Sequence, residues 1–303
     1  MSALETFLEG TIRTATPLAF AALGETVAER AGVINIGLEG AIIAGAFGGF
    51  IGATIGGVWG GYAIAGISGF AVAMVFALFT IRLRADQIIT GTAISLLALG
   101  LTATFFRQLY GTAAGASTIP TMGNFELPGL SAIPLIGQPL FSQPPITYLL
   151  YLLIPATWWW MYRTHAGLAL RAVGESPRAA VAAGVPAGKI QLVAVLFGGA
   201  MGGIAGGVLV IAQAGTFAEG MSAGRGFIAI AIVVLGRWHP LGAAAAAAVF
   251  GAASALQYLF QAMGWPIPYQ IFLALPYILT LLGLAGVAGK VRAPESLGRW
   301  EVV

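Results

Sequence analysis

Ionisable and amide side chains are concentrated in the segment LGETVAERAGVINIGLEG, residues 23–40, close to two apolar runs. An ionisable group inside a membrane span is costly, so it usually faces a cavity or a partner. We therefore expect a broken helix on a permeation path, with Asn35 and Glu39 buried near the membrane boundary. Two alternatives stay open for the other charged residues, a place on this path or a solvated cytoplasmic loop. These residues are Glu25, Glu29 and Arg30.

A second charged, Gly-rich break covers residues 220–242 in the other half of the chain. Its apolar run, residues 226–236, is much shorter than the ~20 residues that a spanning helix needs. This run predicts a broken or re-entrant helix, which is tolerated only where protein or a water-filled cavity covers its ends. Paired interruptions in the two halves of a transporter indicate the translocation path. The candidate path residues of this break are Gly220, Gly224, Arg225 and Gly226.

A basic, Ala-rich segment at residues 165–189 separates two long apolar runs. Glu175 and Ser176 stand where a helix would begin. Pro177 suits an early helical position and Gly184 suits the end of the helix. The segment therefore predicts a short cytoplasmic helix whose small side chains press into a groove of a soluble partner. The alternative is an ordinary cytoplasmic loop.

The elements that position these residues belong in a membrane. The chain is 58% hydrophobic and only 8% charged, with a mean hydropathy of +0.91, whereas soluble domains carry roughly 25% charged residues. We expect an all-α membrane protein, a polytopic bundle of about eight to ten transmembrane helices with broken or re-entrant helices. Residues 1–303 then form a single transmembrane domain. The apolar runs are 11–24, 36–57, 59–81, 87–110, 146–162, 190–212, 226–236, 241–261 and 269–289.

Basic residues indicate the orientation of the bundle. With residues 165–189 in the cytoplasm, alternation of the spans places most Lys and Arg residues on that side, as the positive-inside rule requires. The loop at residues 111–145 then lies outside, and it contains neither Lys nor Arg. The side of the N-terminus stays open because the pattern has exceptions. These are Arg13, Arg107 and Arg225.

Signals for catalysis are missing from the sequence. It has no cysteine, no GxxxxGK[ST] phosphate-binding loop, and neither HExxH nor GxSxG. His165 and His239 have no second ligand at metal-binding spacing, so we expect no metal site. The pI of about 9.4 reflects a few unevenly placed charges and does not indicate nucleic acid binding. We expect no enzymatic activity in this chain.

Two stretches resemble a known family. The first resembles the N-terminal signature of ABC-importer permeases in the branch for nucleosides, simple sugars and branched-chain amino acids: ATPLAFAALGETVAERAGVINIGLEGAIIAGAF. The second resembles the cytoplasmic coupling region of the same branch: HAGLALRAVGESPRAAVAAGVPAGKIQLVAVLFGGAMGGIAGG. The resemblance spans most of the chain, including GRGFIAIAIVVLGRWHPLGA. The run ERAGVINIGLEG is most similar to nucleoside permeases, and ribose-type sugar or branched-chain amino acid permeases remain alternatives.

The resemblance implies the permease subunit of an ATP-driven importer in a prokaryotic plasma (inner) membrane. It implies a small neutral polar solute, nucleosides first, that crosses by alternating access. The implied partners are an ABC ATPase, a second permease that is a related chain in a heterodimer, and an extracytoplasmic solute-binding lipoprotein. No cofactor is implied for this chain, because the partner ATPase binds ATP. By motif match the residues that dock on the ATPase are Glu175, Ser176, Pro177, Arg178, Ala179, Ala180 and Gly184.

Other classes of membrane protein make different demands on the sequence. A proton- or sodium-coupled secondary transporter needs an acidic residue deep in a span as its ion site, and Glu39 is the one fair candidate. A membrane-embedded enzyme needs a catalytic cluster within the bundle, which the sequence does not show. A purely structural subunit needs no coupling helix. The sequence therefore favours the ABC permease.

Overall fold

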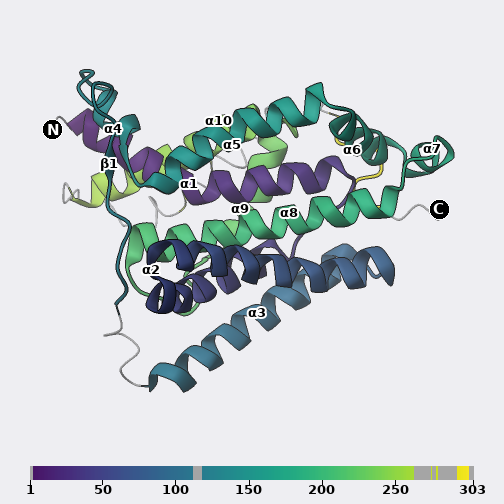
Figure 1. Cartoon of the computed structure of the whole chain (residues 1–303), viewed down its shortest axis with the longest axis horizontal. Helices are drawn as coiled ribbons and strands as arrows, with labels where there is room; N and C mark the ends of the chain where they lie inside the picture. Colours follow the sequence, from purple (N-terminus) through teal and green to yellow (C-terminus); the bar gives the residue numbers. More distant parts are fainter. Residues whose placement is uncertain (1–2, 112–117, 263–273, 275–277, 279–291, 300–303) are drawn as a thin grey trace.

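The computed structural model describes residues 3–111, 118–262, 274, 278 and 292–299 (Figure 1). The helices are α1 (Ala3–Arg30), α2 (Leu38–Ala77), α3 (Gln87–Tyr110), α4 (Gly137–Phe141), α5 (Pro145–Arg163), α6 (His165–Glu175), α7 (Pro177–Ala182), α8 (Ala187–Gly207), α9 (Arg225–Leu235) and α10 (Pro240–Ala262). Two π-helical turns, η1 (Leu78–Arg82) and η3 (Val208–Ala214), extend α2 and α8. The strands β1 (Phe125–Glu126) and β2 (Ser142–Gln143) pair antiparallel.

The long helices run along the molecule, with α6 and α7 at one end and α4, β1 and the N-terminus at the other (Figure 1). Among the residues that the structure describes, four helical stretches are long and apolar enough to cross a membrane: Leu38–Arg82, Gln87–Tyr110, Ala187–Ala214 and Pro240–Phe260. The expected all-α, multi-pass fold is confirmed. The last expected span, residues 269–289, lies almost wholly outside the described residues, so the count of eight to ten helices stays a prediction.

The helix α2 is a hairpin of two antiparallel arms. Its direction reverses at Gly56 and Gly57, where Gly57 has a φ of 63° that glycine adopts readily. A Cβ placed on Gly52 would lie 2.9 Å from the carbonyl oxygen of Gly60 on the opposite arm. The boundary that the sequence predicts between the apolar runs 36–57 and 59–81 is confirmed by this turn.

Glycines of α8 and α2 form a seam, in which α8 packs against both arms of the hairpin. A Cβ on Gly45 would overlap the backbone of Gly203, and a Cβ on Gly69 would overlap the backbones of Gly199 and Gly203. Lipid supplies no hydrophobic driving force between helices, so close backbone approach through small residues holds such helices together. The α2–α8 seam therefore forms the packed frame beside which the shorter elements lie.

Each of the three basic residues that depart from the predicted charge pattern binds another group of the same chain. Arg107 forms an ion pair with Glu219, with 2.6 Å between its Nε and Oε1 of the carboxylate. Arg13 Nη2 donates to the carbonyl oxygen of Gln213 at 3.2 Å. Arg225 Nη1 donates to the carbonyl oxygen of Met221 at 2.8 Å. Each of these three side chains therefore has a hydrogen-bond acceptor within the chain.

Candidate translocation path and coupling region

The carboxylate of Glu39, in the first turn of α2, caps the N-terminus of α9. Its Oε1 accepts a hydrogen bond from the backbone N of Gly224 at 2.8 Å, and its Oε2 accepts one from Gly226 at 2.7 Å. The first N–H groups of a helix lack partners within it, and the helix dipole favours a negative charge there. A Cβ on Gly226 would lie 2.6 Å from the Glu39 Cα, so this approach requires glycine. The two breaks that the sequence singles out therefore touch at this point.

Two further predicted path residues flank this contact. Arg225 folds back onto the preceding turn, where its Nη1 donates to the carbonyl oxygens of Met221 and Ser222. Gly220 lies earlier in the same loop and has a φ of 69°, which glycine tolerates without strain. Gly224 has a φ of 78°. The break is thus a tight glycine turn that leads into α9.

The loop at residues 31–37 folds back into the bundle between α1 and α2. Side chains of α1, α3 and α8 pair with its backbone. The pairs are Ala31 O with Gln191 Nε2 (3.2 Å), Ile34 N with Gln87 Oε1 (2.8 Å), Asn35 N with Glu25 Oε1 (2.8 Å) and Ile36 O with Ser95 Oγ (3.2 Å). Irregular backbone at membrane depth is tolerated where protein covers it in this way. The expected burial of Asn35 is confirmed, but this residue contacts Glu25 rather than the Glu39 cap, and Glu39 is only partly buried.

Glu25 and Glu29 lie one turn apart on α1 and are 0% and 1% exposed. The solvated-loop alternative is therefore wrong for both carboxylates. Glu29 Oε2 accepts a hydrogen bond from the indole Nε1 of Trp238, and the neighbouring Arg30 Nε donates to the carbonyl oxygen of Trp238 at 2.7 Å. Sequence reasoning did not single out Trp238. Its only sequence signal is a tryptophan in the short polar corner between two apolar runs.

The corner between α9 and α10 has an unusual backbone. Arg237 and Trp238 have φ angles of 58° and 52°, in the left-handed region that residues with a Cβ rarely adopt. Such a conformation persists where the surroundings hold it. The ring of the next residue, His239, lies against that of Tyr162 with 5.0 Å between ring centroids and an interplanar angle of 34°. Burial, and then the positive charge of Arg30, lower the pKa of His239 from its ordinary 6.5, which favours the neutral ring at this corner.

The short helix predicted within residues 175–184 is confirmed as α7 (Pro177–Ala182), and its place on the cytoplasmic side stays a prediction. Ser176 is its N-cap, with the side-chain oxygen accepting from the backbone N of Ala179 at 3.3 Å, and Pro177 takes the first position. The helix ends at Ala182, and Gly184 follows with a φ of 83°. Figure 1 shows α7 at the extreme end of the bundle, beyond α6 and α8. This position leaves one face of α7 open.

Not every residue assigned to docking lies on that open face. Ala180 is 4% exposed and packs against Val173 and Ala187, and Pro177 is also buried. Ala180 thus attaches α7 to α6 and α8, and the docking role expected of these two residues stays a prediction. Glu175 and Gly184 are exposed at the two ends of the segment. The exposed face of α7 and its C-terminal turn consists of Arg178, Ala179, Val181, Ala182 and Ala183.

The base of α7 is tied to the end of α1. A Cβ on Gly174, three residues before α7, would overlap the backbone of Arg30. Ser296 also binds Gly174, because its Oγ donates to the carbonyl oxygen of Gly174 at 2.6 Å. Two residues further on, the backbone N of Gly298 donates to the carbonyl oxygen of Gly32 at 3.2 Å. The segment of residues 292–299 thus fastens the end of α6 to the loop after α1.

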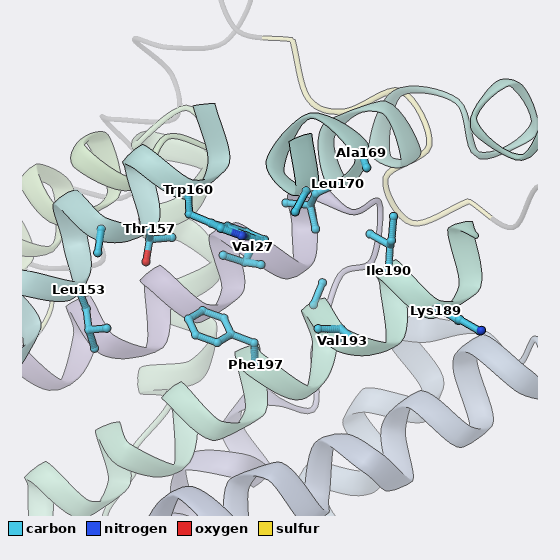
Figure 2. A pocket seen from close by; sticks show the side chains of 13 residues that line it. Val27, Leu153, Thr157, Trp160, Ala169, Leu170, Lys189, Ile190, Val193 and Phe197 are labelled. Carbon is cyan, nitrogen blue, oxygen red and sulfur yellow. The ribbon is translucent and has the colours of Figure 1, made fainter. Parts of the chain in front are cut away.

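A cavity of about 500 Å³ lies between α1, α5, α6 and α8, and its walls are almost wholly apolar. Figure 2 shows Val27, Trp160 and Phe197 converging on it, with the Lys189 nitrogen directed away from these side chains. None of the predicted path residues lines this cavity. Among the described residues, no group of three or more His, Cys, Asp or Glu side chains is placed to hold a metal ion.

Comparison with known proteins connects these features to a family. The family profile described as "Branched-chain amino acid transport system / permease component" matches residues 7–284. The guanosine ABC transporter permease protein NupQ of Bacillus subtilis is 36% identical over 305 residues, which cover 97% of this chain and 96% of NupQ. The nucleoside ABC transporter permease protein NupC of Lactococcus lactis is 32% identical, over 93% of this chain and 92% of NupC.

A Haloferax volcanii protein, named provisionally as the glucose ABC transporter permease TsgC13, is 39% identical over 87% of this chain and 80% of its own length. No solved structure matches the chain. These relatives are transport subunits of ABC systems, which work with an ATPase and a substrate-binding protein. Because the family profile and the relatives cover most of its length, the chain belongs to the branched-chain amino acid transport type of ABC permease components, as a multi-pass membrane protein.

Proposed function

We propose that this permease imports nucleosides across the plasma membrane of a prokaryotic cell. Its partners are an ABC ATPase, a second, related permease chain in a heterodimer, and an extracytoplasmic solute-binding lipoprotein. The observation that carries the proposal is the open face of α7 at the basic end of a chain that resembles NupQ and NupC over nearly its full length. Sugar permeases such as TsgC13 are the nearest alternative class.

The α7 helix is suited to receive force from a soluble ATPase. Its exposed side chains are small apart from Arg178 and Val181, so they fit a groove on a partner. On its buried side Ala180 packs against Val173 of α6 and Ala187 of α8, and Pro177 is also buried. A push on the open face therefore moves α7 together with the ends of both neighbouring helices. Glu175, Ser176 and Gly184 set the ends of this docking unit.

The translocation path that we propose passes the N-terminus of α9. This helix has 11 residues, or about 16 Å at 1.5 Å per residue, roughly half the thickness of the hydrocarbon core. Its N-terminus is bound by Glu39 and preceded by the glycine turn at Gly220 and Gly224. A half-length helix that begins inside the bundle offers polar groups to a neutral solute where the surrounding walls are apolar. Asn35 lies in the adjoining loop, and Arg225 closes the turn.

The first experiment is uptake of radiolabelled nucleosides into vesicles that contain the whole importer. We expect ATP-dependent uptake that glucose and branched-chain amino acids do not inhibit. Uptake of glucose instead would replace the proposed substrate class and leave the ABC mechanism intact. Uptake driven by a proton or sodium gradient without ATP would overturn the mechanism itself.

A matched pair of variants tests the docking face. Ala182→Glu places a charge on the exposed side of α7, so we expect a folded permease that no longer drives uptake. Ala293→Glu makes the same change at an exposed position off α7, and it should leave uptake unchanged. Ala180→Glu points into the contact with Val173 and Ala187, so it should lower the yield of folded protein. Normal uptake by Ala182→Glu would exclude α7 as the docking site.

A further inference from the structure

The short helix α9 is held at both ends by the same segment of the chain. Glu39 binds the backbone N–H groups of Gly224 and Gly226 at its N-terminus. At its C-terminus Glu29 binds the indole of Trp238, and Arg30 binds the carbonyl oxygen of the same residue. Because residues 29–39 contact both ends, α9 cannot shift along its axis without breaking one of these contacts.

Burial and hydrogen bonds hold Trp238 in one position. The Trp238 side chain is 5% exposed, and both its indole N–H and its backbone carbonyl are bound by α1. The left-handed backbone at Arg237 and Trp238 is a conformation that the chain keeps only while such contacts hold it. Losing the Glu29 acceptor would therefore free the corner to relax.

The same end of α1 also touches the base of the docking helix. The Cα of Gly174 lies against the backbone of Arg30, and α7 begins three residues later. Tyr162 provides a second connection, since Arg171 of α6 lies 4.9 Å over its ring and the ring of His239 contacts it with 5.0 Å between centroids. A continuous series of contacts thus runs from α7 through Arg30 to Trp238 and along α9 to Glu39.

We propose that Trp238 is a positioning residue that transmits movement of α7 to the N-terminus of α9. We call the contacts of Trp238 with Glu29 and Arg30 the latch. This inference rests on the proposed docking role of α7. When the latch is closed, the glycine turn before α9 is held shut by the Glu39 cap. When α7 moves the end of α1, the latch shifts α9 and opens the turn. Rigid secondary elements with two discrete arrangements can carry coupling between distant sites, and α9, attached at both ends, is such an element in this proposal.

A cysteine reporter tests the latch without any transported solute. The chain has no native cysteine, so Ser222→Cys introduces a single thiol in the turn before α9, where Ser222 is 2% exposed. The rate of maleimide labelling in membranes then measures how often the turn opens. We expect Glu29→Leu to raise this rate up to about tenfold, the equilibrium effect of losing one hydrogen bond. Trp238→Phe should raise it similarly, because the ring remains but the N–H is lost.

Conservative variants separate the latch from a general loss of packing. Glu29→Gln keeps an acceptor oxygen for the indole N–H, so labelling should return close to the rate of the parent protein. Trp159→Phe changes a tryptophan that is 58% exposed on α5 and should have no effect. Equal labelling in Glu29→Leu and the parent would overturn the proposal. Fast labelling in Glu29→Gln as well would also overturn it, because packing rather than the hydrogen bond would then be responsible.

Adding the ATPase to the same membranes tests the connection to α7. In the parent protein, binding of the ATPase and ATP should change the labelling rate, and Trp238→Phe should abolish most of that response. A response of unchanged size in Trp238→Phe would overturn the transmission route. Nucleoside uptake is measured separately in vesicles. Absence of uptake in the parent would overturn the proposed substrate while the labelling result for the latch still stands.

Discussion

Along the seam between α2 and α8, glycines bring two helix backbones into direct contact, whereas side-chain hydrogen bonds hold the two ends of α9. The backbones of Gly45 and Gly203 lie so close together that a Cβ on Gly45 would overlap Gly203. A carboxylate that caps a helix, as Glu39 does, can release its N–H partners and bind them again. The difference shows how one bundle contains a rigid frame and a short helix that can move against it.

The largest effect should follow from breaking the frame. Gly203→Ala places a Cβ against the backbone of Ala65 and Gly69, where no flexible side chain can yield. Overpacking typically costs about 1–3 kcal/mol, and a backbone obstacle puts this site at the upper end. We expect a marked loss of folded protein and a lower melting temperature in detergent. Gly100→Ala is the control, because nothing lies within 4 Å of its Cβ position. A similar loss of folded protein in this variant would contradict the assignment, because the loss would then not depend on a close helix contact.

A smaller effect should follow from weakening the cap of α9. Glu39→Gln keeps one acceptor but turns an NH₂ group toward the second backbone N–H, which leaves that donor unpaired at a cost of about 1–3 kcal/mol. We expect slower uptake and a modestly lower melting temperature, while the ATPase still co-purifies. Glu126→Gln alters an exposed carboxylate and should change neither quantity. Unchanged uptake by Glu39→Gln would reduce Glu39 to a structural cap.

The smallest effect should come from the ion pair at the opposite end of the bundle. Hydrogen bonds from Arg107 lower the pKa of Glu219 below its ordinary 4.5. A lowered pKa means that the pair stabilises the fold above the unfolded pKa, and that this stabilisation is lost as the pH falls through the folded pKa. The melting temperature of Glu219→Gln should therefore be slightly lower than that of the parent at neutral pH, and equal to it in strongly acidic buffer. A difference that grows on acidification would contradict this assignment.

Local signals in the sequence were sufficient to predict several elements. Ser176, Pro177 and Gly184 predicted where α7 begins and ends, because capping chemistry acts within a few residues. The boundary between the apolar runs 36–57 and 59–81 marked the turn of α2, and the short run 226–236 marked the limited length of α9. The sequence predicted that Glu39 and the break at residues 220–242 belong to one translocation path, but it did not predict that they touch.

Features decided by distant parts of the chain could not be predicted in this way. The six-residue helix α7 is rich in alanine, so no polarity pattern distinguished the inward Ala180 from the exposed Ala182. The bond between Glu29 and Trp238 joins residues that are 209 positions apart. Glu25 looked equally suited to water or to the interior, because its burial depends on the loop that folds back over it.

The hairpin of α2 bears on how the protein enters the bilayer during synthesis. Residues 40–81, which include both arms and the turn at residues 56–57, contain no Asp, Glu, Lys or Arg. Moving a charged group through the hydrocarbon core is the main energetic obstacle to translocating a loop. Since the turn carries no charge, both arms can partition into lipid as one unit. By the positive-inside rule, we expect Arg82 and Arg84, which follow the second arm, to stay on the cytoplasmic side.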